Sequence, residues 1–381
     1  MKYSTIMAIG IESGTYGSLY VSDFPFSGVY RFSTSLSSWT PTGSFTPAVK
    51  EARHIKVHPS NNNYIYVCSD QGIYRSINGG VSWILVKSGK YENIDFMPRT
   101  GGSGLYPYYI YAAGHNTFDV SSDDGLTFSP VTSVLSFFSS YTDVFPDLDY
   151  TIGETANEHY LYIYAAIKAS SISLDYPATQ TSTTAYALYR FKYDALLGTE
   201  TVTKLIIYRD VTNSEDRLAI TADKGIAYFG GECFGKYNSY SGGFYQLYNT
   251  GNDVLIGTSS TISNYGSFAH PDFHDALLLP LYNRVLISDD GGVHVNNYST
   301  TASPGVYSNL CSPKNNGLHI SQVCAMSGTD DDPDLFMTGE QDTKVFKSHA
   351  GGITDFSHGT EPFTVMMDRL NADRYFYGSY Q

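Results

Sequence analysis

Short runs of alternating aromatic and aliphatic residues recur along the whole chain, and they constrain the fold more than any other feature. Examples are residues 64–67, 109–112, 160–163 and 375–377. Alternation of this kind is typical of β-strands, which Tyr and Ile favour. Several runs are followed by glycine, a second short run and a turn of Ser, Asp and Gly, as in a β-hairpin. The sequence therefore predicts an all-β protein with no helix longer than one or two turns.

The hairpins recur at the period of propeller blades. Together with weaker copies of the turn near residues 33–39, 239–245 and 348–356, they divide the chain into about seven units of roughly 45 to 70 residues each. A sheet covered on both faces by its neighbours explains why only 16% of the residues are charged. We expect one β-propeller of about seven four-stranded antiparallel blades over residues 1–381, which either closes within this sequence or continues beyond it.

Two turns carry a more specific pattern. Residues 121–128 read Ser-Ser-Asp-Asp-Gly-Leu-Thr-Phe, and residues 76–83 repeat the pattern with Asn, Ser and Trp in place of Asp, Thr and Phe. The Asp or Asn side chain can accept N–H bonds across the turn, glycine allows a positive φ, and the aromatic ring packs against the sheet. We expect a structural role for Ser76, Asn78, Gly80, Trp83, Ser121, Asp123, Gly125 and Phe128.

These turns resemble the Asp box (BNR repeat) of sialidase-like propellers, and the C-terminal half resembles Asp-box propellers of the sortilin and xyloglucanase group. Three segments carry the second resemblance, in matching order and spacing. They are His270, Asp272 and His274 (HxDxH), Asp290, Gly291 and Gly292 (the DGG turn), and Gln341 and Asp342 (GxQD). The resemblance implies a secreted or cell-surface protein, although this sequence shows no export signal.

The resemblance leaves the function open between binding and hydrolysis. Xyloglucanase-type enzymes pair two propellers around a cleft and take one catalytic acid from each. The N-terminal acid falls at Asp70, but no second acid matches, and Met366 and Met367 replace an expected glycine-rich acidic segment. The sequence favours a non-catalytic interaction module for a protein or a glycan. The alternatives are a glycoside hydrolase truncated to one propeller and a subunit of a larger surface assembly.

A metal site is a weaker hypothesis. His270, Asp272 and His274 alternate, so on a strand they would share one face and could converge on a transition-metal ion. A hydrogen-bonded network at a strand end explains the same pattern, and no complete zinc motif is present. We therefore expect no cofactor and no resident metal.

Charge and hydropathy limit the partners. The chain has 23 Lys and Arg against 37 Asp and Glu, a net charge of −14, without a basic cluster. Such a chain is repelled by nucleic acids and by anionic membrane surfaces. No apolar run approaches the roughly 18 residues of a membrane-spanning helix, so membrane insertion is not expected either.

The cysteines and two polar stretches complete the predictions. Four cysteines are too few for a disulfide scaffold. Cys68 lies in an apolar strand pattern and is expected to be a buried thiol, whereas Cys311 and Cys324 flank a short loop and are either bridged or free. Residues 169–185 and 212–216 are rich in Ser, Thr or charge and are expected to form loops between strands.

Overall fold

The fold is all-β apart from one short helix, α1 (Thr132–Phe138), within the residues that the structure describes. The structure is a computed structural model. The residues that it describes are 5–10, 28–33, 38–49, 52–61, 63–99, 106–175, 180–209, 218–230, 234–238, 243–248, 273–279, 284–289, 292–297, 312–313, 323–328, 336–340, 345–349, 352–356, 362–368 and 371–379.

The described strands form eight antiparallel sheets, numbered here in chain order, and within each sheet the strands lie side by side in sequence order. Sheet 1 has three strands: β1 (Thr5–Gly10), β2 (Gly28–Ser33) and β3 (Ser38–Pro41). Sheet 2 contains β4 (Ala52–Val57), β5 (Ile65–Ser69), β6 (Gly72–Ser76) and β7 (Ile84–Ser88). Sheet 3 contains β8 (Tyr91–Pro98), β9 (Tyr108–Gly114), β10 (Thr117–Ser121) and β11 (Ser129–Pro130). Sheet 4 contains β12 (Asp143–Ile152), β13 (Glu158–Ser173), β14 (Thr181–Asp194) and β15 (Thr199–Arg209).

The remaining sheets continue the same order. Sheet 5 contains β16 (Ala219–Asp223), β17 (Ile226–Gly230), β18 (Phe234–Asn238) and β19 (Gly243–Tyr248). Sheet 6 contains β20 (Phe273–Leu279), β21 (Arg284–Asp289), β22 (Gly292–Asn297) and β23 (Ser312–Pro313). Sheet 7 contains β24 (Val323–Gly328), β25 (Phe336–Glu340), β26 (Val345–His349) and β27 (Gly352–Phe356), and sheet 8 contains β28 (Pro362–Asp368) and β29 (Asn371–Ser379).

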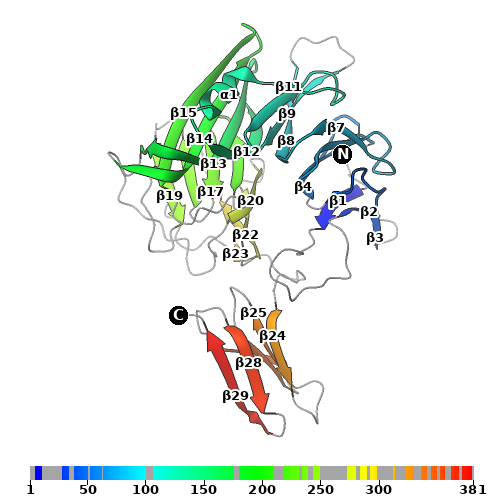
Figure 1. Cartoon of the computed structure of the whole chain (residues 1–381), viewed down its shortest axis with the longest axis vertical. Helices are drawn as coiled ribbons and strands as arrows, with labels where there is room; N and C mark the ends of the chain where they lie inside the picture. The colour runs from blue at the N-terminus through cyan, green and yellow to red at the C-terminus, as the bar shows by residue number, and fades with distance from the viewer. Residues whose placement is uncertain are drawn as a thin grey trace.

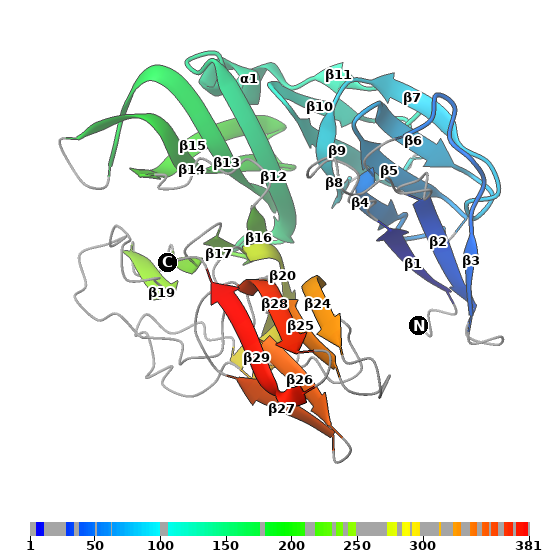
Figure 2. The same ribbon diagram turned by 60° about the horizontal axis from the view of Figure 1, so that its bottom comes forward.

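The first strands of successive sheets are neighbours. The strand β8 lies between β4 and β12, and β16 lies between β12 and β20 (Figure 1). Figure 2 shows sheets 2 to 4 following one another in an arc. Four-stranded antiparallel sheets packed in this way are the blades of a β-propeller. Among the described strands no sheet joins β1–β3 to β28–β29, so a closed ring of seven blades stays a prediction.

Antiparallel order gives every sheet two distinct ends. We call the end of a sheet at which its first strand begins the near end. The turn between the second and third strands lies at this end as well. In sheet 2, for example, Ala52 at the start of the first strand pairs with Ser69 at the end of the second. At the far end the first strand turns into the second and the third turns into the fourth. The two turns predicted to be structural lie at the far end, after β6 and β10.

The core lies between the sheets. Both faces of β5 and β17 are buried, which explains why the strand runs are aromatic rather than alternately apolar and polar. The hydroxyls of several buried tyrosines find partners inside the protein, as Tyr66 does when it donates to the carbonyl oxygen of Asp124 at 2.7 Å. The Cys68 thiol is free and fully buried, as expected, and burial raises its pKa.

The prediction of a loop over residues 169–185 is wrong. The strand β13 continues to Ser173 and β14 begins at Thr181, because Ile172 and Leu174 are buried despite the many hydroxyl side chains around them. The tip is tied to β15, since Asp175 accepts the N–H of Ile207 at 2.8 Å. Residues 212–216 and Cys311 lie outside the described residues, and so does the side chain of Cys324.

No helix in the described part of the chain is both long and apolar enough to cross a membrane. The helix α1 instead connects β11 to β12 and buries Val134 and Phe138. Both side chains join the core cluster between sheets 3 and 4.

A core substitution tests this packing. Ile163 is fully buried in sheet 4, whereas Ile152 of the same sheet is 43% exposed. Ile163→Ala should lower the free energy of unfolding by about 2 to 5 kcal/mol, because a cavity remains where the side chain was. Ile152→Ala should cost less than about 0.5 kcal/mol. Urea unfolding of both variants measures the difference, and equal losses would contradict the described burial.

Candidate interaction surface at the far end of the sheets

The turn between β6 and β7 is closed by its own side chains. Ser76 Oγ accepts the N–H of Gly80 at 2.9 Å, and Asn78 Oδ1 accepts the N–H of Ser82 at 3.0 Å. Gly80 has a φ of 86°, a value that L side chains rarely adopt. The Trp83 ring is 8% exposed and packs against the sheet. These contacts are all internal to the protein.

The turn after β10 repeats the same pattern. Ser121 Oγ accepts the N–H of Gly125 at 2.8 Å, and Asp123 Oδ1 accepts the N–H of Thr127 at 2.9 Å. Phe128 is buried at the position of the first turn's Trp. Burial works against ionisation of Asp123, but hydrogen bonds from Thr127 and Ser121 outweigh it and lower the pKa of the carboxyl group. The ionised side chain is therefore a structural acceptor in this turn.

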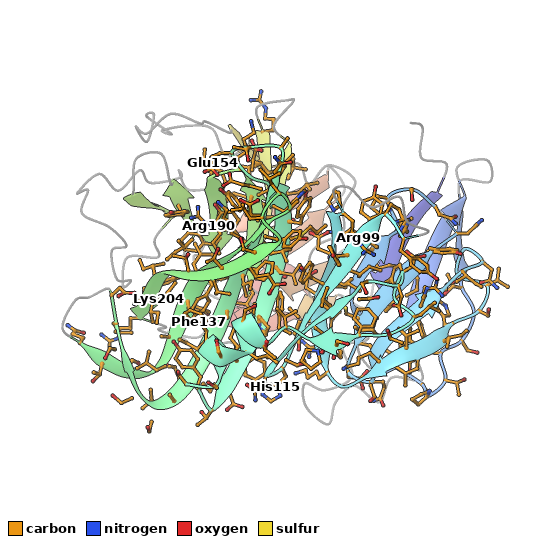
Figure 3. All side chains as sticks on the ribbon, turned by 90° about the horizontal axis from the view of Figure 1, so that it is seen from above. Arg99, His115, Phe137, Glu154, Arg190 and Lys204 are labelled. Carbon is orange, nitrogen blue, oxygen red and sulfur yellow. The ribbon has the colours of Figure 1, made fainter. Side chains whose placement is uncertain are left out.

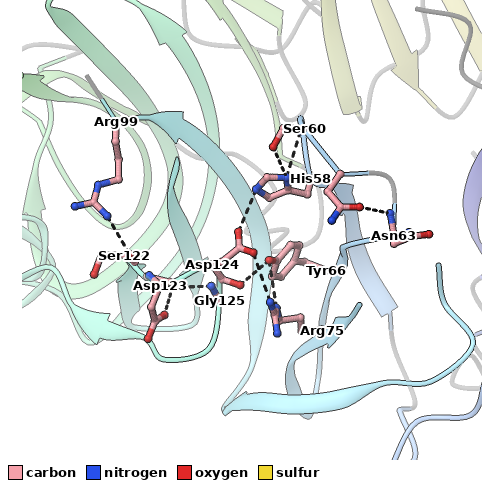
Figure 4. A network of polar contacts seen from close by, with 12 residues as sticks. His58, Ser60, Asn63, Tyr66, Arg75, Arg99, Ser122, Asp123, Asp124 and Gly125 are labelled. Carbon is pink, nitrogen blue, oxygen red and sulfur yellow. Dashed lines mark hydrogen bonds and ion pairs between the residues drawn. The ribbon is translucent and has the colours of Figure 1, made fainter. Parts of the chain in front are cut away.

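The next residue, Asp124, connects sheet 3 to sheet 2 (Figure 4). Its Oδ1 lies 3.1 Å from His58 Nε2, and its Oδ2 lies 3.5 Å from Arg75 Nη2. The Nδ1 of His58 accepts the N–H of Ser60 at 3.2 Å, which leaves the proton on Nε2, facing Asp124. Burial and the charge of Arg75 lower the pKa of His58, although Asp124 opposes them. A neutral imidazole thus joins the two sheets.

The acidic residues on the first strands make a second set of connections. Asp95 Oδ2 accepts the N–H of Tyr150 in the next sheet at 3.0 Å, and its Oδ1 lies 3.2 Å from Lys56 Nζ. Asp149 Oδ2 accepts the N–H of Ala222, again in the next sheet, at 2.7 Å. Burial and the nearby Asp95 charge raise the pKa of Asp149 well above its usual value, against the effect of Lys56. These groups hold sheets together.

Asp70, the candidate catalytic acid, lies at the near end, away from both structural turns. It occupies the tight turn between β5 and β6, where Ser69 Oγ accepts the N–H of Gly72 at 3.1 Å. Its Oδ2 accepts a hydrogen bond from Gln71 Nε2 at 2.6 Å. Burial, together with the Asp70 charge, raises the pKa of Tyr74. A catalytic role for Asp70 stays a prediction.

Most family-like residues lie outside the described part of the chain. These are His270, Asp272, Asp290, Gly291, Gln341 and Asp342; His274 lies in β20 and Gly292 begins β22. The described residues beside them are at the near end, because Phe273 pairs with Asp289 and Val323 pairs with Glu340. In the described residues no three potential ligand side chains are grouped to hold a metal ion. The metal hypothesis stays a prediction, because His270, Asp272 and the side chain of His274 lie outside that part.

A row of aromatic rings follows the boundary between sheets 3 and 4 at the far end. Arg99 lies 4.7 Å from the centre of the Tyr109 ring, and that ring meets Tyr193 edge-on at 5.9 Å. His159 lies near Tyr193 and stacks on Tyr150, whose hydroxyl is 2.9 Å from His159 Nδ1. Tyr109, Tyr193 and Tyr150 are all half-buried. Figure 3 shows Arg99 and Glu154 on the side of the sheets away from His115.

Exposed aliphatic side chains gather at the same end. Nine large apolar side chains are exposed in the described part of the chain, and eight of them lie at or beside far-end turns. Val81 is 70% exposed and Leu196 is 76% exposed. We define the far-end surface as Arg99, Tyr109, Tyr193, Val57, Ile77, Val81, Ile84, Leu126, Ile152, Leu196 and Leu197.

Sequence reasoning missed both this surface and the connections between sheets. The aliphatic residues of the turns stand at variable positions of the turn pattern, as Leu126 does between Gly125 and Thr127. A signal was present, since an exposed turn has no structural need for Ile, Val or Leu. The row of aromatic rings leaves no such signal in the sequence, because its residues come from four separate strands and one connection.

The sequence matches no protein-family profile and no curated protein. Among solved structures, the chain is similar to a GH74 xyloglucanase from Xanthomonas campestris, with 11% identity, a TM-score of 0.42, and 92% of this chain and 59% of the enzyme covered. It is also similar to YCF48 from Cyanidioschyzon merolae (11% identity, TM-score 0.37, 86% and 91% covered). A third similar structure is the Cps50 (Swd1) β-propeller domain of Myceliophteria thermophila, with 8% identity, a TM-score of 0.34, and 87% of this chain and 97% of that domain covered. The chain thus spans about three-fifths of the xyloglucanase.

Asp123→Ala should lower the free energy of unfolding by about 1 to 3 kcal/mol at pH 7, because it leaves turn N–H groups without an acceptor. Since the folded pKa of Asp123 is lowered, this stabilisation is present above its ordinary value of 3.8 and is lost as the pH falls through the folded value. Thermal melts at pH 7 and pH 3 measure both effects. Ser122→Ala, an exposed change in the same turn, is the control. Unchanged stability with lost partner binding would reverse the assignment.

Proposed function

We propose that this chain is a non-catalytic, extracellular or cell-surface interaction module built as a seven-bladed Asp-box propeller of the sortilin and xyloglucanase-like type. Its partner binds the far-end surface. The observation that supports this is a contact between Arg99, Tyr109 and Tyr193 at the boundary of sheets 3 and 4, together with exposed aliphatic side chains at the same end of sheets 2, 3 and 4. Tyr and Arg are enriched at protein interfaces, and grouped exposed apolar residues mark interaction sites.

The chemistry of the far-end surface favours a protein over a glycan. Sugar rings stack on flat exposed aromatic faces, but Trp83 is buried within its own turn. The far-end surface instead offers aliphatic contact area at Leu126, Leu196 and Leu197. An apolar side chain of a protein partner can be buried against this area, whereas a sugar hydroxyl finds no hydrogen-bond partner there. Asp123 is bound within its turn, so the turns act as rigid supports for this surface.

A library of displayed random 12-residue peptides tests the far-end surface. Peptides selected on the wild-type chain should bind at least about tenfold more weakly, or about 1.4 kcal/mol, to the variant Leu126→Ser with Leu197→Ser. Both side chains are exposed, so these changes should leave the melting temperature nearly unchanged. Lys204→Gln, at an exposed position of β15, is the control. Selected peptides that bind the serine variant as well as the wild type would contradict the proposal.

A second candidate is a glycoside hydrolase, because Asp70 lies at the same end as the described neighbours of the family-like segments. Hydrolysis needs two carboxyl groups roughly 5 to 10 Å apart. Under the proposed function, incubation with β-glucan or xyloglucan oligosaccharides yields no new reducing ends, either from wild type or from Asp70→Asn. Turnover by wild type that disappears in Asp70→Asn would replace the interaction module with the hydrolase.

A further inference from the structure

Three basic side chains surround one aromatic ring at the near end of the sheets. Phe145 of β12 is 6% exposed, and the His115 imidazole stacks on it at a centroid distance of 4.5 Å with an angle of 11°. Lys90 Nζ lies 5.5 Å from the centre of the same ring, and Lys168 Nζ lies 5.7 Å from it. Phe145 and Lys168 belong to sheet 4, His115 lies in the turn between β9 and β10 of sheet 3, and Lys90 immediately precedes β8 of sheet 3, so the cluster lies on the boundary between these two sheets.

Hydrogen bonds fix the backbone segments that carry Lys90, His115 and Phe145. The N–H of His115 donates to the carbonyl oxygen of Lys90 at 3.1 Å. The next residue, Asn116, has a φ of 55° and binds sheet 4 twice: its N–H donates to Val144 O at 2.9 Å, and its Oδ1 accepts the N–H of Val144 at 2.7 Å. A site built on such fixed groups loses little conformational entropy on binding.

Basic side chains gather here in a chain whose net charge is −14. Glu92 pairs with Arg53 at 2.8 Å and with Lys90 at 3.6 Å, and Asp143 Oδ1 lies 3.0 Å from His115 Nε2. The contacts thus bring Arg53, Lys90 and Lys168 together with the carboxylates of Glu92 and Asp143. The side chains of Lys90 and His115 are 35% and 36% exposed.

From this geometry we infer that the near end binds an acidic oligosaccharide, with a carboxylate or sulfate group held by Lys90, Lys168 and His115. The ammonium groups of Lys90 and Lys168 can donate charge-assisted hydrogen bonds to a carboxylate or sulfate group. The exposed imidazole, backed by Phe145, gives a sugar ring a flat face to lie on. A peptide strand has little to pair with here, because the backbone of Asn116 and Val144 is already bonded across the sheets.

Calorimetric titration tests the site with four probes: an oligogalacturonate, a sulfated oligosaccharide, a neutral cellulose-type oligosaccharide and inorganic sulfate. At least one acidic oligosaccharide should bind, and more weakly as salt is raised. The double variant Lys90→Gln with Lys168→Gln should weaken this binding at least tenfold. Lys204→Gln removes a lysine that is paired with Asp175 elsewhere on sheet 4, and it should bind as the wild type does.

Several results would overturn the inference. Equal binding of acidic and neutral oligosaccharides would overturn it, and so would a double variant that has an unchanged melting temperature and binds as tightly as the wild type. Inorganic sulfate that binds as tightly as the oligosaccharides would overturn the saccharide assignment. The serine variant of Leu126 and Leu197 should leave this binding unchanged, because those side chains lie at the opposite end. Failure here is therefore distinguishable from failure of the far-end proposal.

Discussion

The arrangement of the sheets depends on one repeated hydrogen bond. A polar side chain on the first strand of one sheet accepts a backbone N–H from the first strand of the next sheet. First strands have neighbours on both sides, so an N–H left without an acceptor there would cost free energy that packing has to offset. The acceptors and donors are His54 and Ile94, Asp95 and Tyr150, Asp149 and Ala222, and Thr221 and Leu278.

The features that the sequence predicted are those with a local cause. Strands were predictable because alternation and β-branched or aromatic residues act within one segment, and the two turns because Ser, Asp or Asn and Gly bond within eight residues. The loop prediction over residues 169–185 failed because a segment rich in Ser and Thr can form either a loop or a strand. Burial of Ile172 and Leu174 against other segments decided the outcome.

The connections between sheets and the two candidate sites could not be predicted in the same way. Asp123 and Asp124 are adjacent and chemically identical, yet the first bonds within its turn and the second contacts His58 and Arg75 of another sheet. Only the relative placement of sheets separates these roles. The same holds for Phe145 and His115, which are 30 positions apart in sequence and stacked in space.

Because this connecting bond recurs at four successive boundaries, from sheet 2 to sheet 6, it ties each of these sheets to its immediate neighbours. Architectures of this type gain or lose whole repeats with limited disturbance to the rest. A newly duplicated sheet would need just one acceptor on its own first strand and one matching N–H for the preceding sheet. Acceptors as different as imidazole, carboxylate and hydroxyl already meet that requirement in this chain, so growth by duplication leaves the first strands free to diverge in sequence.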